Sequence, residues 1–242
     1  MNCVIISDVH GNLEALLAVK KKIEEIAPDE VMFLGDAVGY GAAPNECIEA
    51  LRDLTGIMIA GNHDFGAVNL TDTRLFNPIA REAIDWTSEA LTAANRDFLK
   101  NLPLSHVEGA DMRAVHATPF EPESWHYILS PNHALAEFEH FEETLCFIGH
   151  SHQPVIFELK DSETIVTRTD AMRIERGRRY IVNVGSVGQP RDHDPRACLC
   201  LCNLESGDLH IERVEYDIDA AKKRILDAGL PPVLANRLSW GE

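Results

Sequence analysis

Side chains that commonly bind metal ions follow five short apolar runs in this 242-residue sequence. The first run, residues 2–7, leads into Asp8 and His10. The other four runs are followed by Asp36; by Asn62, His63 and Asp64; by His116; and by His150 and His152. A single histidine in such a place is more often an ordinary loop residue. Because the carboxyl ends of parallel strands share one edge of a sheet, five such ends predict that these side chains meet in one pocket.

The types of these side chains indicate which metals they would bind. Aspartate, asparagine and histidine together offer mixed oxygen and nitrogen ligands. Such ligands suit Mn, Fe, Zn, Co or Ni, whereas Ca and Mg prefer sites made of oxygen ligands alone. The ligands are too many for one tetrahedral zinc ion. Two metal ions that share a bridging carboxylate would use all of them.

The elements that must position these residues alternate in type along the first part of the chain. Apolar runs at 2–7, 31–34 and 57–60 predict strands, and amphipathic patterns at 13–27 and 44–54 predict the helices between them. This order is typical of βαβ units with a parallel sheet. Residues 77–100 are predicted to be mostly helical, strands are expected at 113–116 and 145–148, and a loop and a helix at 119–143.

After residue 152 the apolar pattern shifts toward a period of two. Runs at 155–159, 164–168, 179–184, 197–203 and 208–216 predict an antiparallel sheet, and 217–228 predicts a last helix. Cys198, Cys200 and Cys202 alternate along one of these runs, which indicates small core residues rather than a metal clip. We find no linker or internal repeat, so we expect one domain over 1–242, with two sheets and helices outside them.

Composition excludes several classes of function. A formal charge of −17 argues against general nucleic-acid binding, and it would repel a phosphorylated substrate unless a local metal site reversed it. No segment is apolar enough over about 18 residues to cross a membrane. Strand material begins directly at the N-terminus, and six cysteines without a paired framework favour a reducing compartment. We therefore expect a cytoplasmic protein, with an oligomer left open.

The five polar strand ends resemble, in order, the motifs of the calcineurin-like metallophosphoesterases. The similarity runs from residue 3 to about residue 193, and the segment 183–192 resembles a loop of the small bacterial and archaeal phosphoesterases. The resemblance implies a four-layer αββα sandwich of two mixed sheets. It also implies that Asp8, His10 and His152 hold one metal, that Asn62, His116 and His150 hold a second, and that Asp36 bridges the two.

The resemblance further implies a hydrolase that acts on phosphomono- or phosphodiesters of small molecules or nucleotides. A hydroxide that bridges two divalent transition metals, manganese first among them, would attack the phosphorus. His63 would steady the phosphoryl group or protonate the leaving oxygen, Asp64 would orient His63, and Asn62, His63 and Arg191 would contact the substrate. Residues 37–40 lack the Asp-x-x-Asp-Arg-Gly pattern of Ser/Thr protein phosphatases, which weakens that activity as a candidate.

Two alternatives stay open at this point. A catalytically silent scaffold of the same fold would serve protein interaction, although all seven proposed ligands are present. A nuclease acting on polymers would share the metals but would need a basic track, which the composition does not favour. The aromatic residues Phe120, Trp125 and Tyr127 either overhang the site and stack on a substrate ring or pack within their own loop.

Overall fold

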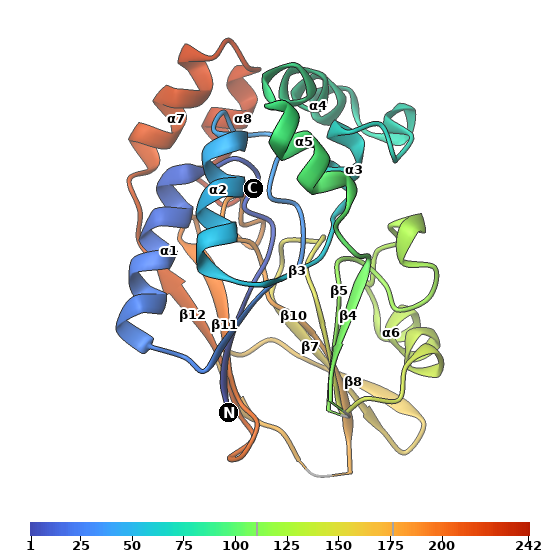
Figure 1. Cartoon of the computed structure of the whole chain (residues 1–242). Helices are drawn as coiled ribbons and strands as arrows, with labels where there is room; N and C mark the ends of the chain where they lie inside the picture. The colour runs from blue at the N-terminus through green and yellow to red at the C-terminus, as the bar shows by residue number, and fades with distance from the viewer. Residues whose placement is uncertain (110, 176) are drawn as a thin grey trace.

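The computed structural model of the protein describes residues 1–109, 111–175 and 177–242. Over these residues two six-stranded sheets pack face to face, with helices on their outer sides (Figure 1). Their strand orders are β3-β2-β1-β11-β12-β9, which we call sheet A, and β4-β5-β6-β10-β7-β8, which we call sheet B. The predicted four-layer αββα architecture is confirmed. No helix in the described part of the chain is long and apolar enough to span a membrane.

The two sheets draw on interleaved parts of the chain. Sheet A contains β1 (Asn2–Ile6), β2 (Glu30–Phe33), β3 (Ile57–Met58), β9 (Ala171–Arg173), β11 (Ala197–Asn203) and β12 (Asp208–Val214). Sheet B contains β4 (Ser105–Glu108), β5 (Met112–Val115), β6 (Leu145–Ile148), β7 (Val155–Lys160), β8 (Glu163–Thr167) and β10 (Arg179–Asn183).

Helices cover the outer faces and the end of the sandwich where the polar strand ends lie. The α-helices are α1 (Leu13–Ile26), α2 (Pro44–Leu54), α3 (Asn62–Ala67), α4 (Pro78–Ala90), α5 (Ala93–Lys100), α6 (Pro131–Glu137), α7 (Ile218–Asp227) and α8 (Pro232–Arg237). Three short 3₁₀ turns are η1 (Thr73–Leu75), η2 (Pro122–Ser124) and η3 (Phe138–His140). Helices α1 and α2 pack on sheet A, and α6 packs on sheet B.

The alternation of side chains along each strand produces separate core layers. In β1, Cys3 and Ile5 enter the core between the sheets, whereas Val4 and Ile6 pack toward α1 and α2. The core between the sheets also contains Cys198, Cys200 and Cys202. Burial raises the pKa of each of these thiols, as expected for inert core residues.

The pairing of the later strands differs from the sequence-based prediction. Strands β7, β8 and β10 join sheet B, and β9, β11 and β12 join sheet A, so the predicted single antiparallel sheet is wrong. Strand β10 runs parallel to β6, and β11 runs antiparallel to β1. An alternating pattern predicts a strand but does not identify its partner, because both sheets bury one face in the same core.

Several element boundaries also differ from the prediction. Strand β3 ends at Met58. The N–H of Ile59 still donates to Phe33 O of β2 at 3.1 Å, but that of Ala60 donates to Pro103 O at 2.8 Å, away from the sheet. Asn62 then begins α3, a helix that the pattern did not predict. Strands β4 and β9 and helix α8 were also not predicted, being short elements without a long periodic signal.

Candidate metal centre

The polar strand ends meet where the carboxyl ends of the parallel strands of both sheets adjoin. Sheet A supplies its residues after β1, β2 and β3, and sheet B supplies its residues after β5 and β6. Three groups have ligand atoms within 4.8 Å of one another: Asp8, His10 and His152; Asp36, His116 and His150; and His10, Asp36 and His63. The structure therefore brings together all the Asp and His residues predicted as ligands.

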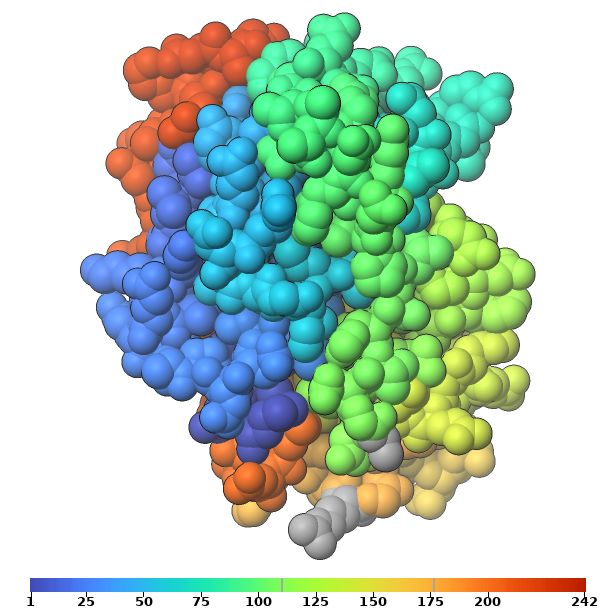
Figure 2. All heavy atoms as spheres, viewed as in Figure 1, coloured from blue at the N-terminus to red at the C-terminus, as the bar shows by residue number. Residues whose placement is uncertain are grey.

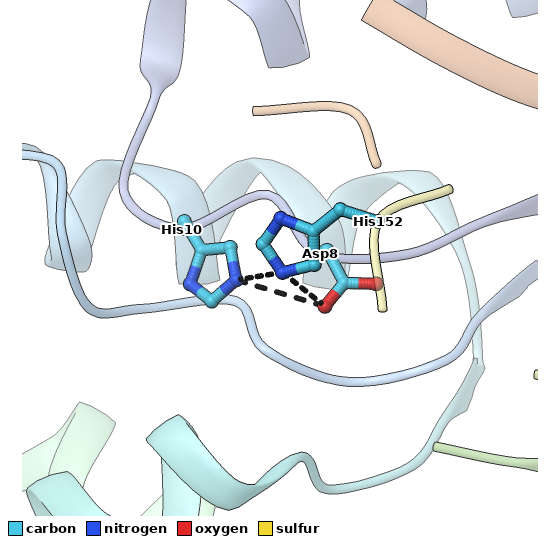
Figure 3. A group of neighbouring side chains, drawn as sticks. All are labelled: Asp8, His10 and His152. Carbon is cyan, nitrogen blue, oxygen red and sulfur yellow. Dashed lines mark hydrogen bonds and ion pairs between the residues drawn. The ribbon is translucent and has the colours of Figure 1, made fainter. Parts of the chain in front are cut away.

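His10 and His152 point the same ring nitrogen at each other. The Nδ1–H of His10 donates to Val38 O at 3.0 Å, and that of His152 donates to Gln189 O at 2.6 Å. Because a carbonyl oxygen only accepts, each neutral ring keeps a lone pair on Nε2. These two Nε2 atoms are 3.0 Å apart and lie 3.6 and 3.2 Å from Asp8 Oδ1 (Figure 3). Three electron-rich atoms at this spacing fit a shared cation.

His116 and His150 are fixed in a comparable way. His116 donates Nδ1–H to Leu34 O at 2.8 Å, which turns its Nε2 toward Asp36 Oδ2 at 3.3 Å. His150 donates Nε2–H to Trp125 O at 2.9 Å, which leaves Nδ1 as its free ligand atom. Histidines that bind metals usually donate their other ring N–H to such an acceptor, because it fixes the tautomer and the ring orientation.

Asp36 lies between the two groups. Its Oδ2 is 3.6 Å from His10 Nε2 and 3.3 Å from His116 Nε2, so one carboxylate oxygen faces ligands of both groups. Its Oδ1 accepts the backbone N–H of His63 at 2.8 Å, which restrains the carboxylate. One carboxylate oxygen is therefore within 3.6 Å of a histidine nitrogen in each group.

Several buried polar atoms in this region have no hydrogen-bond partner among the described residues. They are Asp8 Oδ1, Asn62 Oδ1, His63 Nδ1 and His116 Nε2. Leaving such an atom unsatisfied costs about 1–3 kcal/mol. Asn62 was predicted as a ligand, and its free oxygen completes a donor set of carboxylate, amide and imidazole. The residues present therefore fit divalent transition metals.

Opposite charges stabilise each other among these side chains. Although burial alone would lower it, the Asp36 carboxylate raises the pKa of His116 to about 9. His116 and the other imidazoles in turn hold the pKa of Asp36 well below its usual value, against the effect of burial. Burial lowers the pKa of both His150 and His152 to about 3, so these rings are neutral ligands at ordinary pH.

The backbone is strained at most of the proposed ligands. Positive φ angles of 50–64° occur at Asp8, His10, Asp36, His150 and His152. Non-glycine residues in such conformations cost of the order of 1–3 kcal/mol each and cluster at functional sites. These backbone conformations occur in the loops that follow the strands, where the side chains of the five residues come together.

Two glycines leave room for the carboxylates. A Cβ on Gly149 would lie 2.4 Å from Asp8 Oδ2, and one on Gly61 would lie 2.1 Å from Asp36 Oδ1. Both contacts are far shorter than van der Waals distance. The Gly-His and Gly-Asn pairs in the sequence therefore reflect close packing of the chain against Asp8 and Asp36.

Comparison with known proteins identifies the family. The model of the calcineurin-like phosphoesterase superfamily domain matches residues 1–207. The chain belongs to this superfamily. An uncharacterized protein of Methanocaldococcus jannaschii is 38% identical over 240 residues, which cover 98% of this chain and 97% of that protein.

Two solved structures share the fold over the whole of this chain. The crystal structure of a metallophosphoesterase from Sphaerobacter thermophilus is 38% identical, covers 100% of both chains and has a TM-score of 0.87. A hypothetical protein from Pyrococcus horikoshii is 22% identical, with 100% of this chain and 98% of that chain covered and a TM-score of 0.80. The second similarity supports the fold alone.

Asp64 does not orient His63, contrary to the prediction. Its Oδ2 accepts the N–H groups of Asp36 and Gly61 at 2.8 and 3.0 Å, and its Oδ1 accepts that of Val38 at 3.3 Å. Asp64 is the third residue of α3, where an acidic side chain folds back to the helix start. It therefore anchors the loop that carries Asp36. Burial and the Asp36 charge raise the pKa of Asp64 to about 7, while these N–H groups favour its charged form.

His63 and Arg191 flank the ligands. The ring of His63 lies 4.8 Å from that of His10 and 4.5 Å from that of Tyr40. Arg191 places its guanidinium 5.6 Å from the centre of the Tyr40 ring and donates to Gln189 Oε1 at 2.7 Å. The Tyr40 ring thus lies near both His63 and Arg191. The sequence pattern placed Tyr40 in the loop after Asp36 but did not predict a role for it.

Of the three aromatic residues noted after His116, two face a pocket beside the ligands. Trp125 and Tyr127 line it, whereas Phe120 packs 4.3 Å from the ring of His140. Phe76 and Thr71 also line the pocket and were not predicted. They belong to a segment without periodic pattern, so only the folded chain reveals their position.

Proposed function

We propose that the protein hydrolyses phosphomono- or phosphodiesters of small molecules or nucleotides and depends on two divalent transition metals. The observation that carries the proposal is the pair of opposed Nε2 lone pairs on His10 and His152 beside Asp8 Oδ1. Without a cation or an added proton this arrangement is repulsive. Membership of the superfamily supports the reaction class.

The proposed metal ligands form two sets with one shared member. Asp8, His10 and His152 would hold one ion, and Asn62, His116 and His150 would hold the other, with Asp36 between them. When bound, two such ions supply a water that ionises near neutral pH and positive charge that attracts a phosphoryl group. Manganese is our first choice; iron, zinc, cobalt and nickel suit the same donors.

His63 would assist as a neutral hydrogen-bond donor. Burial lowers its pKa well below the ordinary value, and nearby Arg191 lowers it further, so the ring holds one proton and no charge at neutral pH. A neutral imidazole donates to a phosphoryl oxygen better than it transfers a proton to a leaving group. Arg191 would add a charge-assisted contact to the same phosphoryl group.

A reconstitution assay tests the proposed function. Protein stripped with a chelator is reloaded separately with Mn, Fe, Zn, Co or Ni and offered an aryl phosphomonoester and an aryl phosphodiester. We expect hydrolysis that depends on added metal and is abolished in Asp36→Asn. Absence of turnover with all five metals would contradict the proposal and favour a scaffold of the same fold.

A further inference from the structure

A pocket of about 220 Å³ adjoins the side of the candidate metal centre where His150 lies. It is formed mainly by two segments, one around η1 and one around η2, which face each other beside the ligands (Figure 1). In Figure 2 these segments are the teal and yellow-green surfaces on the right of the molecule. The pocket reaches two proposed metal ligands directly, since Asn62 and His150 line it, and His63 lines it beside them.

Aromatic rings continue from the ligands into the pocket wall. Tyr127 stacks on the His150 imidazole with ring centres 4.0 Å apart and planes inclined by 19°. Trp125 meets the His116 ring edge to face at 5.9 Å, and Phe76 lies 5.1 Å from the His63 ring. Flat apolar surfaces therefore border the space next to the position where a phosphoryl group would sit.

Trp125 fixes this wall to the ligand set. Its indole Nε1–H donates to Thr71 Oγ1 at 3.1 Å, which joins the two segments across the pocket. Its backbone carbonyl accepts the Nε2–H of His150. Its φ of 55° is unfavourable for a bulky residue, so the surrounding contacts must hold it there. Trp125 therefore holds both the aromatic wall of the pocket and the His150 ring in place.

The charges and size of the pocket limit what it can hold. No lysine or arginine lines the described pocket, and its one carboxylate, Asp72, pairs with Arg74 at 2.6 Å. A second phosphate would find no lysine or arginine among the lining residues. The volume is below the roughly 300–1,000 Å³ of typical pockets for drug-sized ligands, so it suits one ring system rather than a polymer. Thr71, Asn77 and Ser124 offer polar atoms to the edge of such a ring.

Resting on the proposed function, we propose that this pocket binds the leaving group of the substrate, a flat uncharged ring-bearing alcohol such as a nucleoside. The ring lies against Tyr127 and Trp125 while the phosphoryl group faces the ligands. The preferred substrate is then a phosphoester of one nucleoside or a similar aromatic alcohol, rather than an aliphatic phosphate or a nucleic-acid chain.

Paired esters test this specificity. The manganese-loaded protein is assayed with adenosine 5′-monophosphate and with glycerol phosphate, two phosphomonoesters that differ in the ring. We expect kcat/KM to be at least about 10-fold higher for the nucleotide, the scale of one base–aromatic stack. Tyr127→Leu and Trp125→Leu should reduce the ratio of the two kcat/KM values toward one. Trp240→Leu, which removes a 68% exposed indole elsewhere, should keep the ratio.

Binding of adenosine, which has no phosphate, provides a readout that does not need turnover. Calorimetry should detect adenosine but not glycerol, with weaker binding in Tyr127→Leu. If the wild type hydrolyses neither monoester, adenosine binding alone decides the pocket assignment. The proposed function fails only if the aryl phosphomonoester and the aryl phosphodiester are also not hydrolysed with any of the five metals. A ratio near one in the wild type, or a ratio and adenosine affinity that neither variant changes, would overturn the inference.

Discussion

The Nε2 atoms of His10 and His152 lie 3.0 Å apart although 142 residues separate them in the chain. His10 follows a strand of sheet A, and His152 follows a strand of sheet B. Each ring is held by a backbone carbonyl that takes its Nδ1–H. The fold therefore directs two lone pairs, one from each sheet, at the same point.

Asp36→Asn should weaken both metal sites. The substitution keeps the size of the side chain but removes the charge that faces ligands of both groups. We expect both affinities to fall by at least about 100-fold, since losing a supporting partner alone costs about 10–100-fold. Metal analysis after dialysis checks this, with exposed Asp97→Asn as the control. Loss of only one ion would show that Asp36 does not bridge.

Gly149→Ala should destabilise the protein and release metal. The new Cβ would lie 2.1 Å from Ser7 Oγ and 2.4 Å from Asp8 Oδ2, so the chain must shift away from Asp8. Overpacking of this kind costs about 1–3 kcal/mol. Urea unfolding measures the loss. Gly56→Ala is the matched control because no atom lies within 4 Å of its Cβ; equal effects of the two changes would contradict the packing argument.

His63→Gln should reduce turnover while the protein keeps its metals. We assign His63 to the phosphoryl group rather than to an ion, and loss of one such donor lowers kcat by about 10²–10³-fold. Steady-state kinetics and metal analysis of the same preparation separate the two roles. Because His63 also has a ligand atom close to His10 and Asp36, loss of metal in this variant would reassign it as a ligand.

The stability of the metal-free protein should depend on pH in two opposite ways. The pKa of His116 is raised to about 9, so its stabilising contribution is complete below about pH 6.5, the pKa in the unfolded chain, and is lost as pH rises through 9. The pKa of His150 and His152 is lowered to about 3, so their contribution is complete above about pH 6.5 and is lost as pH falls toward 3.

Urea unfolding of chelated protein between pH 5 and 9.5 measures both effects. We expect the free energy of unfolding to decrease above neutral pH in the wild type and to be flatter there in His116→Asn. An increase in wild-type stability between pH 7 and 9 would contradict the assignment of a charged His116 beside Asp36.

The sequence predicted that the Asp and His residues proposed as ligands lie close together, because each one follows a short apolar run and the register of a parallel sheet brings such positions together. It predicted the role of Asp64 poorly. That role depends on α3, whose first turn directs the carboxylate back to the backbone of Gly61 and Asp36. Six residues are too few for a periodic signal, so neither the helix nor its consequence could be predicted.

The pocket depends on contacts that no local pattern contains. Thr71 and Trp125 are 54 positions apart, and their hydrogen bond joins two irregular segments. The partners of the later strands were missed for a similar reason. Burial on one face predicts that a strand exists, whereas the choice between sheets A and B depends on how the whole chain closes.

The position of β11 in sheet A bears on how the protein is made in the cell. Strand β11 pairs with the inner strand β1, yet it starts at residue 197, whereas the last proposed ligand is His152. Chains leave the ribosome from the N-terminus. The nascent chain therefore contains every proposed metal donor, and an open edge of β1, before the strand that covers this edge has been synthesised.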